Sequence, residues 1–202
     1  MNPLTSVKGS ITLGVVLALV VSVVLTTTMG GEFAVNGAQL GRWLHILSGI
    51  MWIGLLYYFN VVQIPGLAAA GADKGGPGGA GISKYIAPRA LLWFRWAAVA
   101  TWLTGAYYLT VGYGGHRALL DAFSLHEGLR VIGIGAWLGT IMALNVWLVI
   151  WPNQKKVLGI VAATDDEKAK ARKLAMLASR TNFVLSIPML MCMSGQIHGL
   201  PF

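Results

Sequence analysis

The sequence predicts an all-α integral membrane protein: a five-helix transmembrane bundle with a short cytoplasmic helix before the last span. Of its 202 residues, 56% are hydrophobic and only 11% are charged, whereas soluble domains are about 25% charged. The apolar residues gather in runs of the length that a bilayer requires, about 20 residues. Glycine and tryptophan are also abundant, at 26 and 8 residues, and both are frequent in membrane helices or at their ends.

Five apolar runs define the expected spans. The first follows a head with one basic residue, as in a signal peptide, but no small-residue cleavage pattern follows it. The second and fourth runs stop at Pro65 and Pro152, and proline interrupts helix interiors. We expect a single transmembrane domain over residues 1–202, with spans near residues 11–28, 41–64, 90–112, 131–151 and 179–198. All seven acidic residues lie outside these ranges, as the cost of a charge in lipid requires.

Two segments between the spans have recognisable patterns. The stretch GLAAAGADKGGPGGAGIS is a flexible linker, because it lacks the G-K-[ST] ending of a phosphate-binding loop. Before the last span, Thr164 and Glu167 have the spacing of a capping box, which predicts the start of a helix. The basic sequence KAKARKLAML then predicts a short cytoplasmic helix at an anionic lipid surface.

The basic residues orient the spans. Arg42, Arg117 and Arg130 fall on one side of the membrane, and the other 12 of the 15 Lys and Arg residues fall on the opposite side. Because cytoplasmic loops carry the excess of Lys and Arg, we expect a cytoplasmic N-terminus and an outer C-terminus. The net charge of +8 therefore indicates contact with the lipid bilayer, and a nucleic-acid partner is not expected.

The four histidines supply the candidate site, because this topology places all of them toward the outer side. Imidazole is a common ligand of haem iron and of metal ions, and bundles build such sites from facing helices. His45 and His198 lie near the outer ends of their spans and are the preferred pair for holding haem b or a metal ion. In the alternative interpretation, His45 bonds a carbonyl or water and His198 is solvated. His116 and His126 lie in an outer loop, where a surface role is favoured.

Small and amide side chains inside the spans indicate helix packing. Gly135, Gly139 and Ala143 form a stripe of small residues on the fourth span, where another backbone is expected to pack closely. Asn60 and Asn145 lie in the inner halves of their spans. These two amides are expected to contact each other or to line a cavity.

Four stretches of the sequence resemble a known family: RWLHILSGIMWIGLLYYFN, WFRWAAVATWLTG, GAWLGTIMALNVWLVIWPNQKK and NFVLSIPMLMCMSGQIH. They are similar to the membrane domain of the bacterial membrane-bound urate hydroxylases, the urate oxidase N-terminal family. The resemblance implies a helical domain of the bacterial inner membrane, and the orientation given by the basic residues then makes the C-terminus periplasmic. In long members this domain precedes a cytochrome c domain and is associated with urate oxidation to 5-hydroxyisourate. His45 matches a family histidine, His198 lies two residues from another, and Gly133 stands in place of a third.

The sequence contains no CxxCH motif, so it resembles a short form of the family without the cytochrome c domain. The resemblance then implies that electrons pass to a separate partner, such as a cytochrome c or other membrane subunits. Two functions stay open at this point. One is a redox protein that holds haem; the other is a cofactor-free accessory subunit that docks to a larger respiratory or oxygenase complex through its small-residue stripe and tryptophans.

Overall fold

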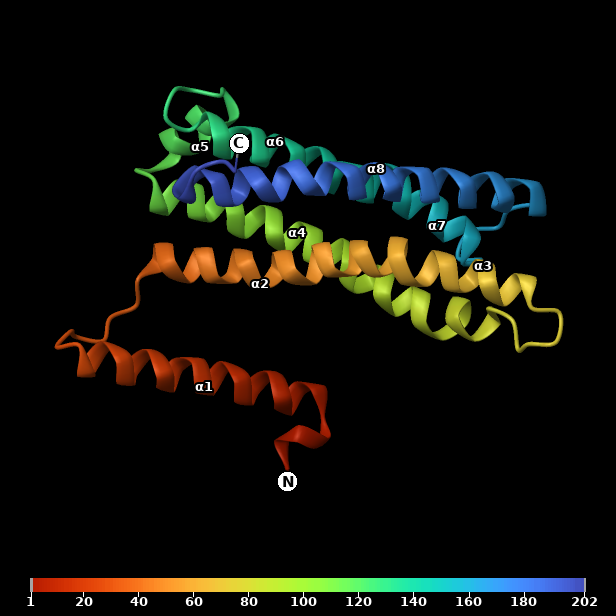
Figure 1. Cartoon of the computed structure of the whole chain (residues 1–202), viewed down its shortest axis with the longest axis horizontal. Coiled ribbons are helices and arrows are strands. Elements are labelled where there is room, and N and C mark those ends of the chain that lie inside the picture. Colours follow the sequence, from red (N-terminus) through yellow and green to blue (C-terminus); the bar gives the residue numbers. More distant parts are fainter. Residues whose placement is uncertain (1, 202) are drawn as a thin grey trace. The chain divides into compact units, whose positions relative to one another are not determined.

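The computed structural model describes residues 2–201, whose regular structure is entirely helical (Figure 1). The chain divides into two compact units, one ending at Asn36 and the other beginning at Gly37. We describe each unit by itself. The helical class predicted from the sequence is confirmed.

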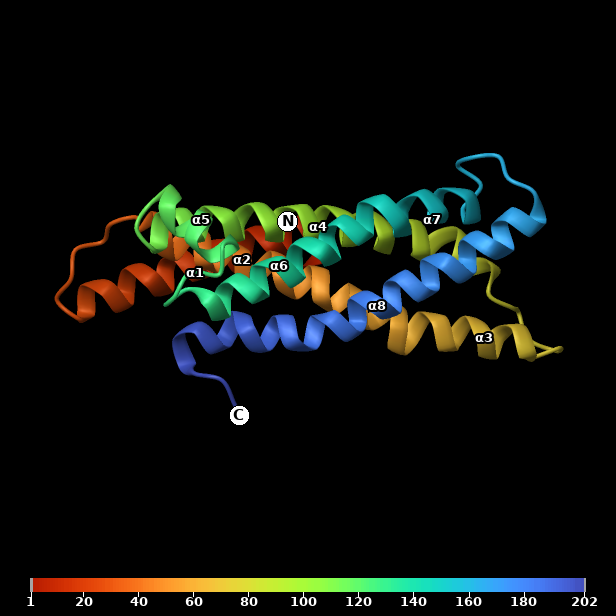
Figure 2. The same cartoon turned by 90° about the horizontal axis from the view of Figure 1, so that it is seen from above.

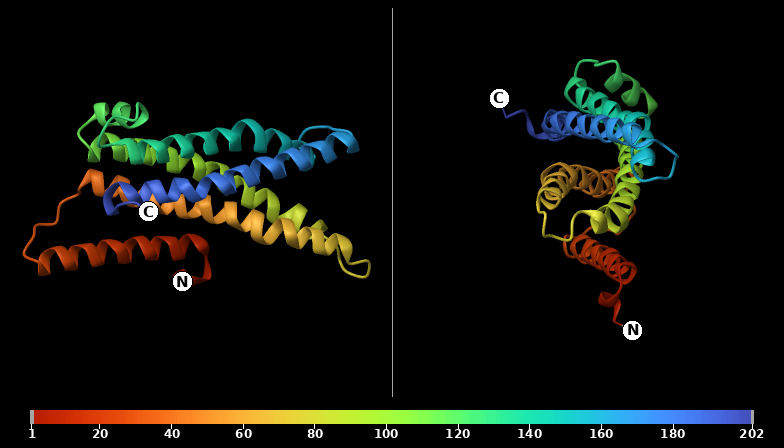
Figure 3. Two further views of the ribbon diagram at one scale, coloured as in Figure 1. Left: turned by 45° about the horizontal axis from the view of Figure 1, so that its top comes forward. Right: turned by 90° about the vertical axis from the view of Figure 1, so that its right-hand side faces the viewer.

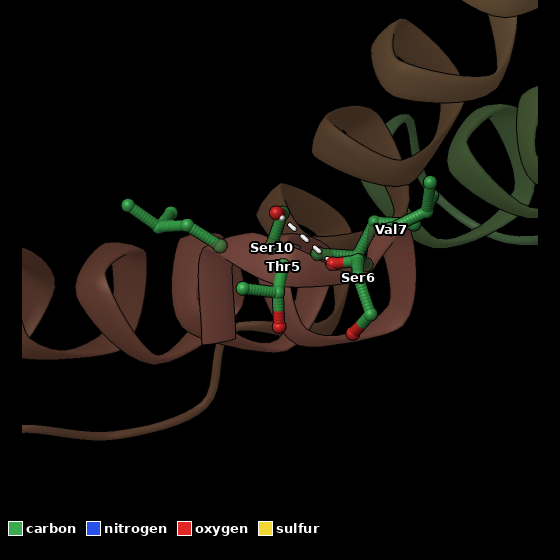
Figure 4. A pocket seen from close by; sticks show the side chains of 6 residues that line it. Thr5, Ser6, Val7 and Ser10 are labelled. Carbon is green, nitrogen blue, oxygen red and sulfur yellow. Dashed lines mark hydrogen bonds between the residues drawn. The ribbon is translucent and has the colours of Figure 1, made fainter. Parts of the chain in front are cut away.

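The first unit is a single apolar helix. A short 3₁₀ turn, η1 (Pro3–Thr5), precedes α1 (Val7–Thr28), and Ser6 caps α1 by accepting the Gly9 N–H at 3.0 Å. No residue of α1 is buried, so its valines and leucines are available to lipid. Figure 4 shows an open hollow at the start of α1, where Ser10 donates to the Ser6 carbonyl at 3.1 Å. Its six lining residues include no titratable side chain, so we assign it no chemistry.

The second unit contains four long helical segments and one short helix, α5 (His116–Phe123), which follows α4. The long segments are α2 (Gly37–Tyr57) with η2 (Tyr58–Gln63) and α3 (Ile64–Ala72); η3 (Ile82–Ile86) with α4 (Ala87–Gly112); α6 (Arg130–Asn145) with η4 (Val146–Ile150) and α7 (Trp151–Val157); and α8 (Asp165–His198).

Each of the π-helical turns η2, η3 and η4 lies just before a proline: Pro65, Pro88 and Pro152. A proline has no N–H, and its ring collides with the carbonyl of the preceding turn. A wider π turn accommodates both effects without ending the helix. The second and fourth spans therefore do not stop at Pro65 and Pro152, as the sequence predicted, but continue as helix to Ala72 and Val157.

The long helices of the second unit pack as two pairs. α2 packs most extensively on α4, and α6 on α8, as the views in Figures 2 and 3 also show. Leu56, Phe94 and Met142 are almost fully buried where the two pairs meet. Between α4 and α6, the Trp102 indole N–H donates to Thr140 Oγ1 at 2.9 Å. Burial of these side chains holds the pairs together over the middle of the unit.

The two ends of this unit differ in composition. α2 begins at the end where α5 lies and α8 finishes, on the left of Figure 1, and we call this the histidine end because it carries His45 and His198. The opposite end holds α3, α7 and the start of α8, and we call it the lysine end. Its lysines are Lys74, Lys84, Lys155, Lys156, Lys168, Lys170 and Lys173.

Among residues 2–201, four helices have the length and composition to cross a membrane: Val7–Thr28, Gly37–Ala72, Arg130–Val157 and Asp165–His198. The span predicted at 90–112 is helical, as α4, but is not among them. Arg95 and several Trp and Tyr side chains make α4 less apolar, and the Arg95 guanidinium stacks 3.6 Å from the ring centroid of Trp151. The structure thus supports a helical membrane protein but does not confirm the five-helix bundle.

The basic segment at 168–177 is not a separate short helix. It forms the first turns of α8, which runs without interruption for 34 residues. The predicted capping box is confirmed at the start of this helix: Thr164 Oγ1 accepts the Glu167 N–H, and the Glu167 carboxylate accepts the Thr164 N–H at 2.8 Å. No break separates the charged and apolar parts, because Ala, Leu, Lys and Arg all favour helix.

Candidate functional site

A cavity of about 610 Å³ lies at the histidine end of the second unit, between α2, α4, α6 and α8. This volume is in the usual range for small-molecule and cofactor sites, about 300–1,000 Å³. Gly49, Gly105 and Gly139 lie on three of its walls, where the absence of side chains leaves space. Most of the lining is apolar. The polar exceptions include Arg42, His45, Trp52, Tyr57, Thr101, Tyr108, Tyr113, Ser194 and His198.

His45 is held in one orientation on α2. Its Nδ1 lies 2.8 Å from the backbone carbonyl oxygen of Thr101 on α4. A carbonyl can only accept, so Nδ1 carries the proton, and in the neutral imidazole Nε2 is the unprotonated nitrogen. Histidines that bind metal or haem iron commonly have this arrangement, in which the second ring nitrogen donates to a carbonyl and fixes the tautomer.

Gly105 on α4 makes room for the His45 ring. A Cβ atom at position 105 would lie 2.8 Å from Cε1 and 3.0 Å from Nδ1 of the imidazole. Gly41, one turn before His45 on α2, makes room for a different ring: a Cβ at this position would collide with the ring of Tyr107 on α4. Sequence reasoning did not single out Gly105 or Thr101, although both lie in the quoted stretch WFRWAAVATWLTG.

His198 lines the same cavity from the last turn of α8. Gln196, two residues earlier, ties this turn to the start of α6: its Oε1 accepts the Ile132 N–H at 2.9 Å, and its Nε2 donates to the Gly128 carbonyl at 2.8 Å. His198 itself is exposed. The structure therefore brings His45 and His198 into the walls of one cavity, and Gln196 ties down the turn of α8 that carries His198.

The other two histidines lie at the same end but do not line the cavity. His116 begins α5 and is exposed, and Nδ1 of His126 lies 3.0 Å from the Glu127 carbonyl oxygen. Within residues 2–201, no three His, Cys, Asp or Glu side chains are grouped so that they could hold a metal ion. A protein site for a bare zinc ion usually supplies at least three such ligands.

Trp52 is a further polar group of the cavity that sequence reasoning missed. It lies seven residues after His45 on α2 and is only 2% exposed, and its Nε1–H has no hydrogen-bond partner among residues 2–201. A buried donor without an acceptor is costly. An acceptor atom of a bound molecule, or a water, would satisfy it.

The predicted small-residue stripe on α6 contacts its own chain. A Cβ on Gly135 would lie 3.1 Å from Cys192 Cβ on α8, whereas Gly139 lines the cavity. Ala143 packs against the buried core. Gly135 therefore permits close approach of α6 and α8 and does not present a face to a separate subunit.

At Gly133, where the resemblance implied that the family has a histidine, the structure leaves no space for a side chain. A Cβ at this position would collide with the backbone carbonyl of Ala122 on α5, and would lie 3.0 Å from a methyl group of Leu125. The close packing of α5 on α6 thus depends on glycine here.

The amides in the half toward the lysine end form a separate network. Asn145 Nδ2 donates to Asn182 Oδ1 at 2.7 Å and to the Ala178 carbonyl at 2.9 Å, and Asn182 Nδ2 donates to the Met142 carbonyl at 3.0 Å. Asn60 bonds instead to Ser179 Oγ, at 2.9 Å. Asn60 and Asn145 are therefore each bonded to α8 and not to each other.

The family model for the urate oxidase N-terminal family matches residues 118–201, from α5 to the end of α8. No curated protein and no solved structure matches the chain. The match covers Gln196, His198 and the α6 and α8 walls of the cavity. Over residues 118–201, it confirms the resemblance to the urate oxidase N-terminal family that the sequence predicted.

Proposed function

We propose that this chain is a membrane redox protein that binds haem b in the cavity at the histidine end and exchanges electrons with a separate partner. The proposal rests mainly on the hydrogen bonding of the two ring nitrogens of His45. Its Nδ1–H is committed to the Thr101 carbonyl, and its Nε2 is left to coordinate in a cavity of about 610 Å³. His198, on the opposite pair of helices, is the proposed second ligand.

The residues present fit haem better than a bare metal ion. Haem iron needs only one or two axial ligands from the protein. The cavity offers two histidines and mainly apolar walls, which suit a flat, apolar ring. When bound, haem would supply one-electron transfer. The protein's own part is to hold the imidazole of His45 in one tautomer, to keep the ring in place against Gly105, and to limit access of water.

The proposed setting is the bacterial inner membrane, with the histidine end toward the periplasm. The support is the charge difference between the two ends, since the lysine end has the Lys excess of a cytoplasmic face. An electron partner would then dock at the periplasmic side, where a soluble cytochrome c or a membrane subunit has access. Urate oxidation is not assigned to this chain, because Gly133 replaces a histidine of the family pattern.

An optical spectrum of the protein purified in detergent tests the proposal. We expect a Soret band in the wild type and in a His116→Ala variant, whose histidine is exposed and outside the cavity. His45→Ala is expected to lose more than nine-tenths of the band. A colourless wild type that binds no added haem would contradict the proposal, as would equal bands in both variants. Co-purification of a colourless protein with a large membrane complex would favour the accessory-subunit alternative.

A further inference from the structure

Arg42 is a basic residue that lines the same cavity as His45. It lies three residues before His45 on α2, so the two side chains emerge on the same face of the helix. Arg42 is half-buried and is nearer than His45 to the start of α2. A permanent positive charge thus lies on the wall of a mainly apolar space, near the start of α2.

This charge has no carboxylate partner within the described chain. The ion pairs among residues 2–201 join Arg117 to Asp121 and Lys168 to Asp165, and neither includes Arg42. A half-buried guanidinium without a counter-ion is destabilising, whereas paired with an anion it forms strong, charge-assisted hydrogen bonds. The arrangement is therefore best suited to an anionic group on a bound molecule.

Tyr113 adds a hydrogen-bond donor near Arg42. Its ring packs against Tyr108 with centroids 5.6 Å apart, and both tyrosines line the cavity. Burial raises the pKa of the Tyr113 phenol, and Tyr108 raises this pKa further, whereas the positive charge of Arg42 lowers it. The phenol therefore stays protonated at neutral pH and can donate to an anion.

We infer that Arg42, assisted by Tyr113, anchors the carboxylates of the bound cofactor. Haem carries two propionate groups, so the inference rests on the proposed function and deepens it. Arg42 and Tyr113 would hold the carboxylates, and the apolar lining of the cavity would contact the ring. Arg42 is thus a positioning residue for the cofactor and not an axial ligand.

Equilibrium binding of two cofactors to the detergent-purified apoprotein tests this inference. One is haem b, and the other is its dimethyl ester, which has the same ring and iron but no carboxylate charge. Each is titrated into the wild type, Arg42→Gln, Arg42→Lys and Arg117→Gln. Arg117 is a matched control, because it is exposed, lies at the same end and does not line the cavity. A loss of about tenfold to a hundredfold in haem affinity is expected for Arg42→Gln, as for a charged hydrogen bond.

We expect the preference for haem over its ester to depend on the residue at position 42. The wild type binds the ester more weakly than haem, Arg42→Gln binds both equally, Arg42→Lys recovers part of the preference for haem, and Arg117→Gln behaves as the wild type. Equal loss of both cofactors in Arg42→Gln would overturn the inference and indicate a merely structural role. No change in either would also overturn it and would indicate that Arg42 serves only the lipid surface. If the wild type binds neither cofactor, the proposed function itself fails, which is a distinct result.

Discussion

Two groups of polar side chains in the second unit differ in what they contact. In the half toward the lysine end, Asn145 and Asn182 bond to each other and to backbone carbonyls, and Asn182 is fully buried. In the half toward the histidine end, Arg42 and Trp52 line a cavity. Among residues 2–201 Arg42 has no carboxylate partner and the Trp52 Nε1–H has no hydrogen-bond partner, and His45 has one nitrogen free to coordinate. Polar groups that satisfy one another hold helices together, whereas polar groups that face a cavity are available to a ligand.

Mutations in the two halves are therefore expected to affect different properties of the protein. A change in the amide network should lower the stability of the fold and leave the cofactor affinity of the folded protein almost unchanged. A change around His45 should do the reverse. Coupling between the halves is expected to be small, because the sites share no hydrogen-bond partner.

Asn182→Ala is expected to have the largest effect on stability. It removes two buried hydrogen bonds, to Asn145 and to Met142, each worth about 1 kcal/mol, so the free energy of unfolding should fall by about 2 kcal/mol. Unfolding in mixed SDS micelles measures this change. Thr181→Ala is the control, because Thr181 is exposed and bonds only within its own helix. Equal stability of the two variants would remove the amide network from the account.

Gly105→Ala is expected to weaken haem binding with the fold intact. The new methyl group would lie 2.8 Å from His45 Cε1, so the ring must turn away from the Thr101 carbonyl. A loss of about tenfold in affinity, or about 1.4 kcal/mol, is expected in a haem titration. Gly66→Ala in α3 meets no atom within 4 Å and should bind haem as the wild type does. Unchanged binding by Gly105→Ala would show that the orientation of His45 is unimportant.

Gln196→Leu is expected to loosen the end of α8. It removes the bonds to Ile132 and Gly128, and with partial exposure the cost should be about 1 kcal/mol. Hydrogen exchange at the Ile132 amide, which loses its acceptor, should become faster, while exchange in the middle of α6 stays the same. Uniform protection in both proteins would indicate that Gln196 does not position His198.

Thr101→Val is expected to have the smallest effect. The group that accepts from His45 is the backbone carbonyl of residue 101, and the side-chain hydroxyl bonds to Ala97 within α4. Haem affinity should therefore change by less than about threefold, which is within about 0.7 kcal/mol. A loss as large as that of Gly105→Ala would mean that the hydroxyl, and not the carbonyl, determines the state of His45.

Much of this fold could be predicted from the hydropathy pattern. A helix that crosses a bilayer needs about 20 apolar residues, so each such helix leaves an apolar run of that length in the sequence. The pattern could not show that the helices pass through Pro65 and Pro152, since a π turn is a local adjustment of the backbone with no composition of its own. It also could not show that α8 is continuous, because the change from basic to apolar residues at about 178 is a change of environment and not of conformation.

The candidate site was predictable to the level of its histidines. Topology alone placed His45 and His198 toward one side, and the structure places both in the lining of one cavity. Thr101 and Gly105 were not predicted because their contribution depends on the register between α2 and α4, which are 56 residues apart at the His45 contact. Thr101 acts through its backbone carbonyl and Gly105 through the absence of a side chain, and neither contribution can be recognised from the residue type.

Thermal unfolding with and without added haem b tests the central claim most directly, because a ligand that binds only the folded state raises its melting temperature. The melting temperature of the wild type and of Asn182→Ala should rise on addition of haem, although Asn182→Ala starts from a lower value. That of His45→Ala should not change. An equal rise in His45→Ala and in the wild type would contradict the assignment of the cavity as a haem site.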